Sequence, residues 1–201
     1  MLVQGTLPNA RQRALLEAVF VASVENGAHA PSVFVPRVSA SVGNDIHVAL
    51  AAGLLAMGER HGGAAEQAAD VLMQKKTARD IVAAFLREKK AIPGFGHKIY
   101  KDRDPRAVAL YEKARLLKLP LAAFTKAHAI EAELEKMKGK RVPLNVDGAI
   151  AASLLTLQFS PKAGKALFAI PRLAGMTAHI LEEYAQGNSY YRLSEDEVEE
   201  A

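Results

Sequence analysis

Three residues whose side chains can exchange protons or donate hydrogen bonds stand beside glycine at breaks in the chain: His61, His97 and Asp147. Glycine adopts backbone angles that other residues resist, and it lets a ligand approach the main chain. Each of these side chains can therefore face a ligand. The ordinary alternative for each one alone is a cap or a hydrogen-bonded structural group, and Asp147, just ahead of an expected helix, is typical of an N-cap.

The segment around His97 reads Pro93-Gly94-Phe95-Gly96-His97, and it continues to Asp104-Pro105-Arg106. Two glycines and a proline predict a tight loop around the imidazole. Arg106 carries a permanently charged fork that matches the geometry of a carboxylate. An imidazole near a carboxylate-binding arginine favours chemistry on an organic acid. The simpler alternative is a surface turn with solvated charges.

Composition narrows the class of protein. The chain has 201 residues, half of them hydrophobic, which suggests one domain or two closely coupled parts. The absence of cysteine excludes disulfides and thiolate metal sites, and it fits a cytoplasmic protein. A net charge of +4 suits anionic ligands. We expect no membrane span, no secretory signal and no nucleic-acid binding, because the basic clusters are short and lack interleaved aromatic residues.

The sequence predicts an all-α protein, because Ala, Leu, Lys and Glu dominate and β-branched runs are scarce. Helices are expected at residues 10–24, 33–41, 46–57, 64–73, 78–89, 105–118, 124–138, 149–157 and 168–184. The helix at 46–57 is dense in Ala, Gly and Leu, which is typical of a helix buried on most sides, in a core or at a subunit interface. We expect residues 77–140 to form a small domain that moves against a large domain, made of residues 1–76 and 141–201.

Three motifs together resemble the active-site segments of the citrate synthase superfamily: His-Gly-Gly-Ala at 61–64, Pro-Gly-Phe-Gly-His at 93–97 and Asn-Val-Asp-Gly at 145–148. This superfamily includes citrate synthase, 2-methylcitrate synthase, citryl-CoA lyase and the C-terminal module of ATP-citrate lyase. The resemblance covers about residues 25–192. It implies an all-α, citrate synthase-like dimer with a large helical domain and a small mobile one.

The resemblance also implies roles in making or breaking the bond between acetyl-CoA and oxaloacetate through citryl-CoA. Asp147 is the base for the methyl proton, His61 donates a hydrogen bond to the thioester oxygen, and His97 does so to the ketone oxygen. The expected substrate-binding residues are Arg106, Arg172, Arg192 and Asn26, and the expected CoA-binding residues are Gly94, Phe95 and Gly96. No cofactor is expected to be bound permanently, since the coenzyme A thioester is itself a substrate.

Two departures from the family pattern bear on the activity. Many relatives carry a histidine where this chain has Asn26, whose amide cannot be cationic. His29, three residues further along the chain, is the candidate to take the place of that histidine. The chain also lacks the long N-terminal helical region of citrate synthases, and in this respect it is similar to citryl-CoA lyase or the lyase module of ATP-citrate lyase. A lyase of this kind would work with a separate citryl-CoA synthetase.

Alternatives stay open at this point. A 2-methylcitrate synthase-like enzyme differs by one methyl group on the acyl-CoA, which the sequence does not decide. A catalytically silent scaffold partner could retain the same dimeric, or higher oligomeric, fold. A metal site is disfavoured because no His-x-x-x-His spacing occurs on one helix. The remaining histidines, expected to be structural or on the surface, are His47, His128 and His179.

Overall fold

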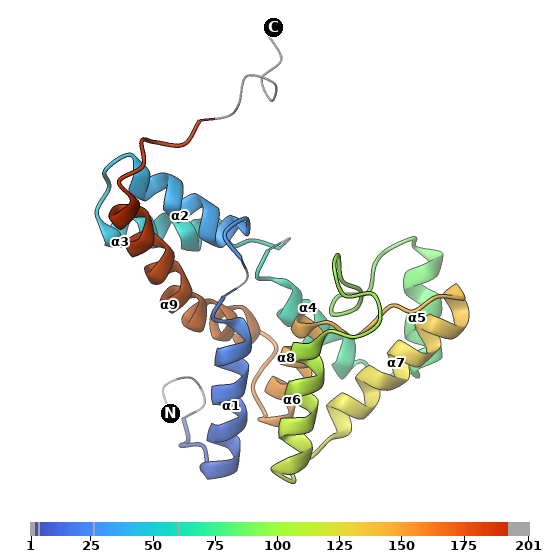
Figure 1. The fold of residues 1–201 in the computed structure, drawn as a ribbon. Coiled ribbons are helices and arrows are strands. Elements are labelled where there is room, and N and C mark those ends of the chain that lie inside the picture. The colour runs from blue at the N-terminus through green and yellow to red at the C-terminus, as the bar shows by residue number, and fades with distance from the viewer. Residues whose placement is uncertain (1–2, 4, 26, 60, 193–201) are drawn as a thin grey trace, which may run out of the picture. The chain divides into compact units, whose positions relative to one another are not determined.

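The computed structural model describes residues 3, 5–25, 27–59 and 61–192. Within these ranges the regular structure is helical, which confirms the predicted all-α class (Figure 1). The helices are α1 (Ala10–Ser23), α2 (Pro31–Ser41), α3 (Ile46–Leu55), α4 (Ala64–Met73), α5 (Ala78–Arg87), α6 (Pro105–Leu116), α7 (Ala122–Lys138), α8 (Val146–Thr156) and α9 (Ala163–Gln186). None of the described helices is both long enough and apolar enough to cross a bilayer.

The chain divides into two compact units. The first contains Met1–Ser23 and Gly62–Pro171, and the second contains Val24–His61 and Arg172–Ala201. The boundary falls inside α9, directly after Pro171. The sequence-based division, with a small domain at residues 77–140, stays a prediction.

Helix α8 is the centre of the first unit. It contacts α1, α4, α6 and α7, and nearly all of its residues are buried. Its sequence, rich in alanine and ending the first turn with Gly148, lets these neighbours approach closely. The helix begins at Val146, three residues earlier than the expected start at Ala149, because the Asn145 side chain caps it by accepting the N–H of Gly148 at 3.1 Å. Asp147 therefore lies inside the first turn, and its expected place as the N-cap is wrong.

In the second unit, α2 packs against α3. Only Ala49 and Gly53 of α3 are buried in the described chain, so the expectation of a core helix buried on most sides is wrong within this chain. The reason is that a single small cluster, which includes Ile180 of α9, covers one side of α3. Its other side leaves Leu55 88% exposed and Val48 42% exposed.

The remaining helix ends differ from expectation for local reasons. Proline fits the first turn of a helix, and α2 accordingly begins at Pro31 rather than Val33. Helix α9 begins at Ala163, five residues before the expected start at Phe168, and continues through Pro171. The other ends of α1 to α7 lie within two residues of the predicted ones.

Candidate active site

The loop that carries His97 is tied to the segment before Asp147 within the first unit. Gly94 and Gly96 have φ angles of +88° and +86°, which lets the chain turn sharply. The N–H of Gly96 donates to the carbonyl of Pro143 at 2.7 Å, and the N–H of Asn145 donates to the carbonyl of Gly94 at 3.0 Å. Two motifs about fifty residues apart in sequence thus form one piece of structure.

Backbone hydrogen bonds set the tautomer of His97. Its Nδ1 accepts the N–H groups of Ile99 at 3.1 Å and Tyr100 at 3.0 Å. A ring nitrogen that accepts carries no proton, so the neutral ring holds its proton on Nε2. Nη2 of Arg106 lies 3.3 Å from this Nε2. The two groups are then neighbouring donors, and both can donate to one substrate oxygen.

Asp104 orients Arg106 and was not among the sequence-based site residues. Its carboxylate accepts Nε of Arg106 at 3.0 Å and Nη2 at 2.9 Å, and it also accepts the N–H of Val146 at 2.9 Å. Burial alone would raise the pKa of Asp104, but the Arg106 guanidinium and the backbone donors outweigh burial and hold that pKa below its ordinary value. The ionised carboxylate connects the predicted carboxylate-binding arginine to the start of α8. The sequence signal was an acidic residue before Pro105, typical of an N-cap.

Ser32 holds His61 in the second unit. Nε2 of His61 lies 2.8 Å from Oγ of Ser32 and accepts the Ser32 N–H at 3.3 Å. Oγ in turn accepts Nη1 of Arg172 at 3.2 Å, which leaves the hydroxyl proton for His61. The neutral imidazole therefore carries its own proton on Nδ1. Ser32 lies in none of the three motifs and was not among the predicted site residues.

His61 is expected to stay neutral below the pH at which most histidines gain a proton. Burial first, and then the positive charge of Arg172, lower the pKa of His61 from its ordinary value of 6.5. Because the pKa of His61 is lower in the folded state than in the unfolded chain, the neutral ring favours folding. This stabilisation is complete above pH 6.5 and is lost as the pH falls below 6.5. Titration of the ring by NMR measures this, and Arg172→Gln should raise the value. Arg192→Gln is the control, and an apparent pKa at or above 6.5 would contradict the assignment.

The other predicted substrate-binding residues have different surroundings. Arg172 is only 2% exposed, and its Nη1 donates to Oγ of Ser32. Arg192 is exposed, with its guanidinium carbon 4.5 Å from the centre of the Tyr190 ring. Asn26 lies outside the described residues. Substrate binding by these three residues stays a prediction. Among the described residues, no group of three or more acidic or histidine side chains is placed to hold a metal ion.

Comparisons with known proteins agree with one another. The family described as "Citrate synthase, C-terminal domain" matches residues 1–194. Citrate synthase 2 of Bacillus subtilis is 33% identical over 76% of this chain and 42% of its own length. The 2-methylcitrate synthase of Shewanella oneidensis is 29% identical over 98% of this chain and 53% of its own. The chain spans about half the length of the curated relatives it matches.

One solved structure is similar over nearly the whole chain. The citryl-CoA lyase of Hydrogenobacter thermophilus superposes with a TM-score of 0.93 and is 39% identical. The match covers 99% of this chain and 80% of the lyase. This similarity confirms the citrate synthase-like helical fold predicted from the sequence.

Proposed function

Because this chain belongs to the citrate synthase family, we propose that it forms or cleaves the carbon–carbon bond of citryl-CoA, between acetyl-CoA and oxaloacetate. The observation that carries the proposal is the position of His97 beside Arg106, 3.3 Å from Nε2 to Nη2, together with the hydrogen bonds by which Asp104 joins Arg106 to the segment that leads into Asp147. In our proposal it supplies a hydrogen-bond donor, a cation that binds a carboxylate and a carboxylate that acts as the base. These are the groups that the reaction needs.

In the direction of synthesis, Asp147 takes a proton from the methyl group of acetyl-CoA. The thioester oxygen gains negative charge as the enolate forms, and the Nδ1–H of His61 donates to it. The enolate carbon then attacks the ketone carbon of oxaloacetate. The ketone oxygen becomes an alkoxide, which accepts the Nε2–H of His97. In cleavage the hydroxyl of citryl-CoA loses its proton to solvent, and the resulting alkoxide accepts a hydrogen bond from Nε2–H of His97. The carbon–carbon bond then breaks to give oxaloacetate and the enolate, and Asp147, protonated at the start, gives its proton to the enolate carbon.

The substrate carboxylates require cations. Arg106 is the first candidate, because Asp104 already fixes the orientation of its guanidinium. We propose Arg172 and Arg192 as further carboxylate-binding residues, with Asn26 as a neutral hydrogen-bond donor. The backbone of Gly94, Phe95 and Gly96 would contact CoA, since glycine lets the thioester approach the main chain closely.

We favour citryl-CoA cleavage as the direction, because the solved lyase superposes with a TM-score of 0.93 and this chain covers 80% of it. In this case a separate citryl-CoA synthetase would supply the substrate, in the cytoplasm. The second candidate, a 2-methylcitrate synthase-like enzyme, is favoured by the relative from Shewanella oneidensis.

We further propose that the protein is a homodimer that associates through α3. Its exposed apolar side chains include Val48, Leu54 and Leu55. Exposed apolar side chains on one helix favour association. The small residues between them, Ala51 and Ala52, would let two helices approach closely. Mass measurement in solution by light scattering tests this, with Leu55→Glu expected to yield monomer.

The experiment that tests the function uses the purified protein with citryl-CoA and, separately, with acetyl-CoA plus oxaloacetate. Acetyl-CoA and oxaloacetate released from citryl-CoA, without free CoA and citrate from the second mixture, would indicate a lyase. Free CoA and citrate from the second mixture would indicate a synthase. In a third mixture propionyl-CoA replaces acetyl-CoA, and turnover faster than with acetyl-CoA would favour the 2-methylcitrate alternative. If no mixture reacts, the proposal fails and a silent scaffold becomes the better interpretation.

A further inference from the structure

The segment Pro143–Val146, which leads into α8, has two hydrogen-bonding edges like a short β-strand. On one edge Pro143 and Asn145 exchange hydrogen bonds with Gly96 and Gly94 of the His97 loop. The antiparallel bridge between Phe95 and Leu144 marks this edge as paired. In an extended chain the N–H groups of alternate residues point to the same side. The N–H groups of Leu144 and Val146 therefore face away from the loop and need other acceptors.

Two carboxylates supply these acceptors. Oε1 of Glu131 accepts the N–H of Leu144 at 2.8 Å, and Oδ2 of Asp104 accepts the N–H of Val146 at 2.9 Å. Leu144 is 4% exposed and Val146 is 8% exposed, so both residues are largely shielded from bulk solvent. A buried N–H without a partner is costly. The two carboxylates thus occupy the place that the carbonyls of a neighbouring strand would take.

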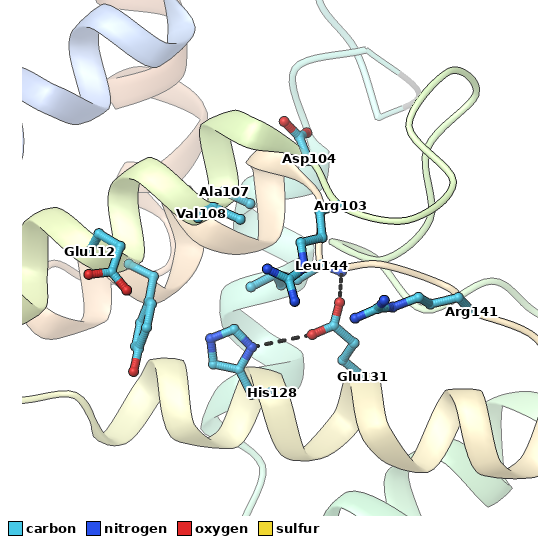
Figure 2. Close-up of a pocket in the computed structure, with 10 residues that line it drawn as sticks. Arg103, Asp104, Ala107, Val108, Glu112, His128, Glu131, Arg141 and Leu144 are labelled. Carbon is cyan, nitrogen blue, oxygen red and sulfur yellow. Dashed lines mark hydrogen bonds and ion pairs between the residues drawn. The ribbon is translucent and has the colours of Figure 1, made fainter.

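Glu131 itself is held in place on α7. Its Oε2 lies 3.3 Å from Nδ1 of His128, and Figure 2 shows the carboxylate pointing from α7 towards Leu144, between His128 and Arg141. Burial would raise the pKa of Glu131, but hydrogen bonds from His128 and the Leu144 backbone, with the charge of Arg141, outweigh it and lower that pKa. An ionised carboxylate makes the stronger hydrogen bond to a backbone N–H.

A cavity borders the segment on its other side. It has a volume of about 260 Å³ and lies between α6 and α7, and both Glu131 and Leu144 line it (Figure 2). Side chains that border a cavity make fewer packing contacts on that side. The hydrogen bond from Leu144 to Glu131 is therefore a main restraint on the segment where it faces the cavity.

We propose that Glu131 is a positioning residue: by accepting the Leu144 N–H, it fixes the segment that leads into Asp147. The kinetic part of this inference rests on the proposed function, with Asp147 as the base. Leu144 is three residues from Asp147, and Asn145 between them caps α8 through Gly148. A shift of the segment would therefore move the first turn of α8 and the carboxylate on it. Misplacement of a catalytic group by about 1 Å can cost about a hundredfold in rate.

The test compares three variants of the full chain. Glu131→Met keeps the length of the side chain but removes the oxygen acceptor, whereas Glu131→Gln keeps an acceptor and removes the charge. Glu135→Met is the matched control, because Glu135 lies one turn further along α7, is 53% exposed, and pairs with Arg141 rather than the segment. Steady-state kinetics with citryl-CoA give kcat and KM. Amide hydrogen exchange of Leu144, followed by NMR, reports the hydrogen bond without reference to activity. If Glu131→Met does not fold, Glu131→Ala replaces it.

We expect Glu131→Met to lower kcat by about ten- to a hundredfold, with KM within about threefold of the parent and Leu144 exchange at least about tenfold faster. Glu131→Gln should stay within about threefold of the parent in kcat, and Glu135→Met should match it. Fast exchange with unchanged kcat would overturn the positioning role, as would a Gln variant as impaired as Met. Unchanged exchange in Glu131→Met would overturn the restraint itself. If the parent protein is inactive, the proposed function fails, and exchange alone decides whether Glu131 holds the segment.

Discussion

Replacing Asp147 with asparagine is expected to lower kcat by about a hundred- to ten-thousandfold, the usual contribution of a positioned general base. The amide has nearly the shape of the carboxylate but cannot accept a proton from carbon. Asp147 lies in the first turn of α8, where a negative charge also interacts favourably with the helix dipole, and losing this dipole interaction should cost about 0.3–1 kcal/mol of stability. The measurement is turnover of citryl-CoA at saturating substrate.

Proton exchange gives a second measurement for the same variant. The parent protein should transfer deuterium from D₂O into the methyl group of acetyl-CoA, because Asp147 removes and returns that proton. Asp147→Asn should lose this exchange together with turnover. Asp70→Asn on α4 is the control, since Asp70 is exposed and acidic but lies in no predicted motif. Exchange at the parent rate in Asp147→Asn would show that another group is the base.

Replacing Gly94 with alanine is expected to destabilise the fold by about 2–5 kcal/mol. The φ angle of Gly94 is +88°, a conformation that costs an L-residue about 1–2 kcal/mol. A Cβ there would also lie 2.8 Å from Cα of Gly148 and 2.9 Å from Cβ of Ala68. Because the first of these neighbours is backbone at the start of α8, it cannot rotate away, and such overpacking costs about 1–3 kcal/mol. Urea unfolding followed by circular dichroism measures the loss.

Gly139→Ala separates the two costs. Gly139 ends α7 with a φ angle of +64°, and a Cβ there would have no heavy atom within 4 Å. This variant should therefore lose only the conformational part, about 1–2 kcal/mol. Equal losses of stability in the two variants would mean that a Cβ at Gly94 has no steric cost, and that α8 does not require a glycine there.

Local sequence was informative wherever a residue and its immediate neighbours decide the outcome. The start of α4 was predicted from Gly62-Gly63 just before it, and the start of α6 was predicted from Asp104-Pro105. The turn at Gly94 and Gly96 followed from glycine itself. The start of α8 was misjudged because Asn145 and Asp147 are both good caps, and only the geometry shows that Asn145 takes the position.

The sequence by itself determined the all-helical class, the family, and three motifs that carry His61, His97 and Asp147. Tertiary structure alone decided which groups hold these residues, because Ser32 is 29 residues from His61 and Glu131 is 13 residues from Leu144. A hydrogen bond between distant residues leaves no periodic pattern in a sequence, since its partners meet only when helices pack. Burial of α3 also depends on which elements pack against it. Its apolar composition predicted a helix packed on most sides, but the fold of this chain leaves much of its apolar surface exposed.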